Sequence, residues 1–199
     1  MGKTKLVLAS ANSGKIKEIK DLFPDYEVIG YKDLGLDFEI EETGNTFFEN
    51  ALIKARAVYE KTGFPALADD SGLEVDVLKG APGIFSARYS GTGTDAGNIE
   101  KLLRELGDEK DRKAKFICQM VYFDGKKIVT ERGETSGYIL YVPQGNSGFG
   151  YDPVFYSMDL GKPFGLATEK EKNSVSHRAR AAVKMQKRLS EHMKGKDDE

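Results

Sequence analysis

Two adjacent aspartates, Asp69 and Asp70, follow a short apolar run and could carry acid–base or metal chemistry. Neighbouring carboxylates repel each other, so a cation between them or near them would offset the cost. Glu42, in an acidic segment before a predicted helix, could supply a further carboxylate. Since these donors are hard oxygens and the chain has only two histidines, the set favours Mg²⁺, or Mn²⁺ as a substitute, over Zn²⁺. An ordinary polar turn over 69–72 explains the same residues equally well.

A polar turn near the N-terminus, residues 10–15, lies between a predicted strand and a predicted helix. The free N–H groups and the dipole of a helix N-terminus attract anions. Lys15, in the first helical turn, opposes that dipole, and an anion bound beside it would remove the conflict. The turn is therefore a candidate phosphate site, and a capped turn with a solvated lysine is the alternative. It is not a P-loop, because the Gly-x4-Gly-Lys-Ser/Thr spacing is absent.

Two later segments could recognise a nucleobase. The glycine-rich stretch 147–153 contains Phe149, whose ring could stack on a base, and Asp152, whose carboxylate could accept hydrogen bonds from a base edge. Near the predicted start of the last helix, Lys172 and Arg178 could donate to phosphate oxygens or to a base carbonyl. A flexible loop and a solvated basic helix start are the alternative interpretations.

The elements that must position these residues follow from hydrophobic periodicity, which predicts an α/β protein. The sequence predicts helices over about 16–23, 46–62, 95–106 and 176–193, and strands over about 5–9, 66–68, 73–77, 114–123, 127–132 and 134–142. A capping-box pattern begins the second helix at Thr46, and Asp124-Gly125 predicts a hairpin. The charged tail 194–199 is expected to fray, and His192 just before it is expected to be solvated.

Composition limits the class of protein. A chain of 199 residues with 39% hydrophobic residues is expected to form one domain over 1–199. The net charge of -2 argues against a protein that binds long nucleic acids. No apolar run approaches the roughly 18 residues of a membrane span, so no membrane partner is expected. The single cysteine, Cys118, lies in an apolar run and is expected to be buried, which suits a reducing cytoplasm.

The order of these motifs resembles one family, the inosine/xanthosine triphosphate pyrophosphatases, which hydrolyse non-canonical purine nucleoside triphosphates. The similarity runs from about Leu6 to Leu189. The segments that carry it are Ser10 to Lys15 with Glu18, Glu42 to Ala51, Leu67 to Val75, Pro82 to Ser90, Phe149 to Phe155, and Ser176 to Ala179.

The resemblance implies a hydrolase that cuts ITP, dITP and XTP to the monophosphate and pyrophosphate, removing them from the nucleotide pool. The implied fold is an elongated, two-lobed α/β structure, with a central mixed β-sheet flanked by helices and a substrate cleft between the lobes. The family usually forms homodimers and requires Mg²⁺. The implied partner is a small-molecule purine triphosphate, with no nucleic acid and no membrane.

Roles follow for the residues that match the family's motifs. Asp70 is assigned as general base and could also contact the metal, while Asp69 and Glu42 would hold or orient that metal. The turn up to Lys15, with Lys54 as a helper, would hold the phosphates, and Phe149 would stack on the purine. Asp152, His177 and Arg178 would read the edge of the base. The predicted substrate-binding residues are Ser10, Ala11, Asn12, Ser13, Gly14, Lys15, Ser71, Phe149, Gly150, Tyr151, Asp152, Lys172, His177 and Arg178.

Selectivity for these bases can be explained by hydrogen bonding at position six of the purine. Hypoxanthine and xanthine present a 6-oxo acceptor where adenine presents a 6-amino donor, so donors aimed at position six could reject adenine by as much as about 10⁴-fold. Guanine shares the 6-oxo group, and the residue that rejects GTP is not identified. The alternatives are a related pyrophosphatase with another base preference and a nucleotide-binding module without turnover. The carboxylates argue against the second, because a pure triphosphate binder would gain from cations in their place.

Overall fold

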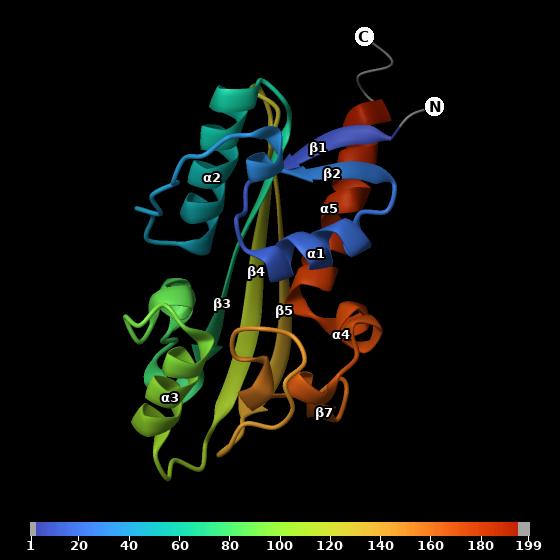
Figure 1. The fold of residues 1–199 in the computed structure, drawn as a ribbon. Coiled ribbons are helices and arrows are strands. Elements are labelled where there is room, and N and C mark those ends of the chain that lie inside the picture. The colour runs from blue at the N-terminus through green and yellow to red at the C-terminus, as the bar shows by residue number, and fades with distance from the viewer. Residues whose placement is uncertain (1–2, 195–199) are drawn as a thin grey trace. The chain divides into compact units, whose positions relative to one another are not determined.

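The computed structural model describes residues 3–194, and the tail predicted to fray lies outside them from residue 195 onward. The protein is α/β, with a seven-stranded mixed sheet of order β2-β1-β3-β4-β5-β6-β7 (Figure 1). Strand β1 pairs in parallel with β2 and β3, whereas β6 pairs antiparallel with β5 and β7. The strands are β1 (Thr4–Leu8), β2 (Tyr26–Gly30), β3 (Ala66–Val75), β4 (Lys113–Phe123), β5 (Ile128–Ile139), β6 (Phe155–Ser157) and β7 (Lys162–Pro163).

Helices flank this sheet, as expected. They are α1 (Ser13–Leu22), α2 (Phe47–Thr62), α3 (Asp95–Leu106), α4 (Glu169–Val175) and α5 (His177–Lys194). Short 3₁₀ helices cover Tyr31–Leu34, Asp76–Leu78, Gly83–Arg88, Asp152–Val154 and Phe164–Leu166. Within residues 3–194, no helix has both the length and the apolar character needed to cross a bilayer.

The chain divides into two compact units. Unit 1 comprises residues 1–70, 118–133 and 178–199, and unit 2 comprises residues 71–117 and 134–177. Strands β3, β4 and β5 contribute residues to both units, so neither unit is one continuous stretch of chain.

The core of unit 1 has two layers, one on each face of its strands. Leu6 and Leu8 pack with residues of α1 and α5, whereas Val7 packs with residues of α2. Side chains alternate between the two faces of a strand, so a near-continuous apolar run such as β1 serves both layers. Figure 1 shows α2 on the opposite side of these strands from α1 and α5. The core of unit 2 packs α3 and the segments that contain Phe155 and Phe164 against Phe116 of β4.

Two predictions about the elements were wrong. Strand β3 continues through residues 69–72, where a break between two strands was expected, because buried cationic partners remove the cost of placing carboxylates there. Strand β5 likewise continues through Gly133, where two strands were expected. The last predicted helix, over about 176–193, is confirmed as α5. The separate helix α4 before it was not predicted, and its start has a complete capping box between Thr168 and Glu171. Strand β2 was not predicted.

His192 is not solvated, contrary to expectation. It lies in α5, and its Nε2 is 3.0 Å from Oδ2 of Asp124, with both side chains less than a tenth exposed. Helix α5 runs far enough to bring this histidine to the turn after β4, which accounts for the difference. Cys118 is buried, as expected.

Candidate active site

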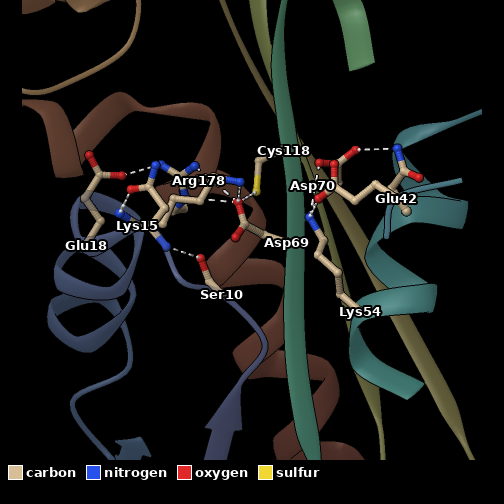
Figure 2. A network of polar contacts seen from close by, with 11 residues as sticks. Ser10, Lys15, Glu18, Glu42, Lys54, Asp69, Asp70, Cys118 and Arg178 are labelled. Carbon is tan, nitrogen blue, oxygen red and sulfur yellow. Dashed lines mark hydrogen bonds and ion pairs between the residues drawn. The ribbon is translucent and has the colours of Figure 1, made fainter. Parts of the chain in front are cut away.

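Strand β3 places Asp69 and Asp70 on its opposite sides, because successive side chains of a strand alternate (Figure 2). Both carboxylates are buried, with exposed fractions of 1% and 5%. Asp70 faces residues of α2, while Asp69 faces Lys15 of α1 and Arg178 of α5. The ion pair of Asp70 is thus with Lys54, whereas those of Asp69 are with Lys15 and Arg178.

Asp70 belongs to a network with Glu42, Asn50 and Lys54. Nζ of Lys54 lies 2.7 Å from Oε1 of Glu42 and 3.2 Å from Oδ1 of Asp70. Nδ2 of Asn50 donates to the other oxygen of Asp70, Oδ2, at 3.3 Å. Helix α2 supplies both Asn50 and Lys54, which are one turn apart and face β3. Both oxygens of the Asp70 carboxylate are thus held by side chains of one helix.

Burial controls the acid–base properties of this network. Burial raises the pKa of Asp70 above its ordinary value, although the cations of Lys54 and Lys15 act in the opposite direction. Burial by itself would lower the pKa of Lys54, but the charges of Asp70, Glu42 and Asp69 outweigh it and raise that pKa. Asp70 is therefore a stronger base than an exposed aspartate, beside an ammonium that stays charged at neutral pH.

Glu42 and Asp70 have the chemistry to hold a divalent cation, because their oxygens already converge on one ammonium. Among residues 3–194, no group of three or more histidine, cysteine, aspartate or glutamate side chains could hold a metal ion. A bound ion would need further oxygens from water and substrate, which is how Mg²⁺ is commonly bound. The predicted set of three carboxylates is divided in this structure, since Asp69 lies on the far side of β3.

Asp69 is held by two cations. Its Oδ2 lies 3.1 Å from Nζ of Lys15 and 3.2 Å from Nη2 of Arg178, whose Nη1 pairs with Glu18. Burial opposes the charge of Arg178, but Asp69 and Glu18 outweigh that effect and raise its pKa. Sγ of Cys118 lies 4.0 Å from the same carboxylate oxygen. Arg178, which was predicted to read a base edge, is here engaged with two carboxylates of unit 1.

The predicted phosphate turn forms the start of α1. Asn12 is the N-cap, and its Oδ1 accepts a hydrogen bond from the backbone N–H of Lys15. Residues 11–13 are exposed, so this helix start is accessible to an anion. The conflict between Lys15 and the helix dipole is resolved by Asp69, which supplies the negative charge.

In unit 2, the structure brings Phe149, Asp152 and Lys172 together. Oδ2 of Asp152 accepts from the backbone N–H of Phe149 at 2.9 Å and lies 2.6 Å from Nζ of Lys172. That ammonium lies 4.5 Å from the centre of the Phe149 ring, a cation–π contact. His177 instead stacks on Phe116 at 4.8 Å.

The loop that contains Phe149 is anchored on both sides. The N–H of Gly150 donates to Asp95 of α3 at 2.7 Å, and the hydroxyl of Tyr151 donates to the carbonyl of Ser86 at 2.8 Å. A hollow of about 580 Å³ lies between α3 and this loop, and Phe149 forms part of its wall. Asn50 and Asp95 were not predicted to be functional residues, because Asp70 and Gly150, with which they bond, are distant in the chain.

Comparison with known proteins places these features in a family. The model of the Ham1 family matches residues 6–188. The dITP/XTP pyrophosphatase of Treponema denticola is 48% identical over 183 residues, covering 89% of this chain and 94% of that protein. The dITP/XTP pyrophosphatase of Clostridium perfringens is 46% identical over 198 residues, covering 93% and 97%.

Solved structures of Ham1 proteins also match this chain. The Ham1 protein of Staphylococcus aureus has a TM-score of 0.85 and 43% identity, covering 95% of this chain and all of that one. A HAM1 protein from Coxiella burnetii has the same TM-score and 41% identity, covering 94% and 99%. The suspected resemblance is confirmed, and this chain belongs to the Ham1 family.

Proposed function

We propose that this protein hydrolyses dITP, ITP and XTP to the nucleoside monophosphate and pyrophosphate; its relatives in Treponema denticola and Clostridium perfringens are named dITP/XTP pyrophosphatase. The observation that carries the proposal is the buried Asp70, whose pKa is raised and whose two oxygens are held by Lys54 and Asn50. Cutting the α–β phosphoanhydride needs water activated for attack on the α-phosphorus, and a positioned carboxylate of raised pKa suits that role.

The residues of unit 1 divide the chemistry of the triphosphate between them. Asp70 would take the proton from the attacking water, while Lys54 keeps Glu42 and Asp70 at fixed separation. Lys15 and the exposed start of α1 would bind phosphate oxygens, with Lys15 exchanging part of its interaction with Asp69 for the substrate. Mg²⁺ held by Glu42 and Asp70 would neutralise charge on the leaving pyrophosphate.

Recognition of the base is assigned to unit 2. Phe149 would stack on the purine, and the nearby Lys172 offers donors that suit a 6-oxo group and not a 6-amino group. Asp152 keeps Lys172 and the Phe149 backbone in place and could accept from an N–H of the base edge. The contacts of His177 and Arg178 with the base stay predictions.

A panel of nucleotides tests the proposed substrate class. With Mg²⁺ present and pyrophosphate release as the readout, we expect kcat/KM for ITP, dITP and XTP to exceed that for ATP or dATP by about 10²- to 10⁴-fold. TTP and UTP are included to detect a preference for another base. If they are cleaved as well as ITP and XTP, the chain is a pyrophosphatase of a different specificity. ITP binding without pyrophosphate release would instead indicate a binding module.

The same reactions run with EDTA in place of Mg²⁺ test the proposed cofactor. Chelation is expected to abolish turnover, and Mg²⁺ or Mn²⁺ added back is expected to restore it. Unchanged turnover after chelation would contradict the assignment of Glu42 and Asp70 as metal ligands.

The family resemblance also leads us to propose a homodimer in the cytoplasm. Sedimentation equilibrium tests the dimer directly. The single cysteine supports a reducing compartment, because the chain cannot form an intramolecular disulfide.

A further inference from the structure

Asn50 joins two segments that carry the proposed chemistry. Its side chain is fully buried on α2, four residues after Thr46, the N-cap of that helix. Oδ1 accepts from the backbone N–H of Gly44 at 2.8 Å, and Nδ2 donates to Oδ2 of Asp70 at 3.3 Å. Gly44 is two residues from Glu42, so one amide connects the segment of Glu42 with Asp70.

The orientation of this amide is dictated by its partners. A backbone N–H can only donate, so the group of Asn50 that faces Gly44 must be its oxygen. The NH₂ group is then left facing Asp70, as a donor and never as an acceptor. The approach is close: a Cβ on Gly44 would lie 2.7 Å from Oδ1 of Asn50 and 2.6 Å from Cβ of Glu49. A side chain at position 44 would therefore collide with Asn50 and Glu49, so this contact requires glycine.

Helix α3 contains a similar hydrogen-bonding arrangement, in which the asparagine donates to a backbone carbonyl and not to a carboxylate. Asn98 is buried and lies four residues after Thr94, the N-cap of α3. Its Oδ1 accepts from the backbone N–H of Ser90 at 2.8 Å, just as Asn50 accepts from Gly44. Its Nδ2 donates to the backbone carbonyl of Ala87 at 3.1 Å, where Asn50 donates to a carboxylate. Asn98 therefore shows what this arrangement does when it only fastens a loop to a helix.

We propose that Asn50 is a positioning residue for the reaction, and that it acts by holding Oδ2 of Asp70 while Lys54 holds Oδ1. With both oxygens held, the carboxylate cannot rotate, and one lone pair stays aimed at the site of the attacking water. This role rests on the proposed pyrophosphatase function. It extends that function to a residue that would contact neither substrate nor metal.

Asn50→Asp is the main test, because it keeps an oxygen for the N–H of Gly44, replaces the donor to Asp70 with an acceptor and adds one negative charge there. We expect kcat for ITP to fall by about 100-fold, the cost of displacing a catalytic group by about 1 Å, while KM stays within about 3-fold. Asn98→Asp is the matched control. We expect it to lose about as much thermal stability as Asn50→Asp, but to keep kcat within about 3-fold of that of the protein without substitutions.

Equal losses of kcat in the two variants would overturn the proposal, since Asn50 would then be a structural residue like Asn98. Asn50→Ala covers the case in which Asn50→Asp does not fold. It removes the donor without adding charge, and its kcat is expected to fall by at least about 10-fold at similar KM. An Asn50→Ala protein with unchanged kcat would equally overturn the proposal.

Crystal structures separate this proposal from the proposed function. If the protein without substitutions hydrolyses none of the nucleotides tested, the pyrophosphatase assignment is refuted. The position of the Asp70 carboxylate can still be determined from the crystal structures of the variants. In Asn50→Asp we expect the Asp70 carboxylate to rotate away from residue 50, and in Asn98→Asp we expect it to stay. An Asp70 carboxylate that keeps its place in Asn50→Asp overturns the positioning role.

Discussion

Asp70→Asn is expected to reduce hydrolysis of ITP by about 10²- to 10⁴-fold, the range typical of losing a general base. Asparagine has the shape of aspartate but cannot take a proton from water at neutral pH. The side chain would stay between Asn50 and Lys54, but it has a single acceptor oxygen, so its NH₂ group would face one of those two donors. The measurement is kcat for pyrophosphate release, set beside the Kd for ITP from calorimetry.

ITP binding by the Asp70→Asn protein is expected to survive, because phosphate binding is assigned to the turn before Lys15 and base recognition to residues around Phe149. Asp111→Asn, at an exposed carboxylate, provides the control for the substitution itself and is expected to leave kcat unchanged. Turnover equal to that of the unchanged protein would refute the role of Asp70 as general base. Loss of binding together with turnover would indicate that Asp70 acts chiefly in holding substrate or metal.

Arg178→Met is expected to destabilise the protein by about 3–5 kcal/mol, because it leaves the carboxylates of Asp69 and Glu18 without their buried guanidinium. Arg178 is only 1% exposed, so little water can replace it. Methionine is of similar length and flexible, which keeps the contribution of a cavity small. The free energy of unfolding, measured by urea denaturation at neutral pH, gives the comparison.

Arg188→Met, on the same helix, is the matched control. Arg188 is 58% exposed and pairs with Glu131 at 3.4 Å, so its loss is expected to cost about 0–1 kcal/mol. An Arg178 variant as stable as the Arg188 variant would show that the buried ion pairs contribute no net stability. Arg178 would then be better explained by its predicted contact with the base.

Helices α1, α2, α3 and α5 were predictable because their signals are local, whereas the seven-residue α4 was missed. The apolar stripe of α2, the threonine at its N-cap and the glycine that ends it at Gly63 all lie within one stretch of sequence. The same holds for α3, which begins after Thr94 and ends at Gly107. Strand β2 was missed because its five residues have only weak alternation, and its place depends on pairing with β1.

The course of β3 could not be predicted from local signals. Residues 69–72 have the composition of a turn, and in isolation two adjacent carboxylates would favour exposure to water. They remain in a buried strand because Lys15, Lys54 and Arg178 arrive from three different helices. Arg178 is separated from Asp69 by 109 residues, so no window of sequence contains that information.

The sequence by itself determined the family, the α/β class and the short list of residues that could act on a triphosphate. Only the tertiary structure decided how those residues are divided. Alternation along β3 turns Asp70 toward Asn50 and Lys54, while Asp69 turns toward Lys15 and Arg178 (Figure 2). Residue type and spacing specify which groups are present, but burial and non-local charge decide the electrostatic surroundings of each carboxylate.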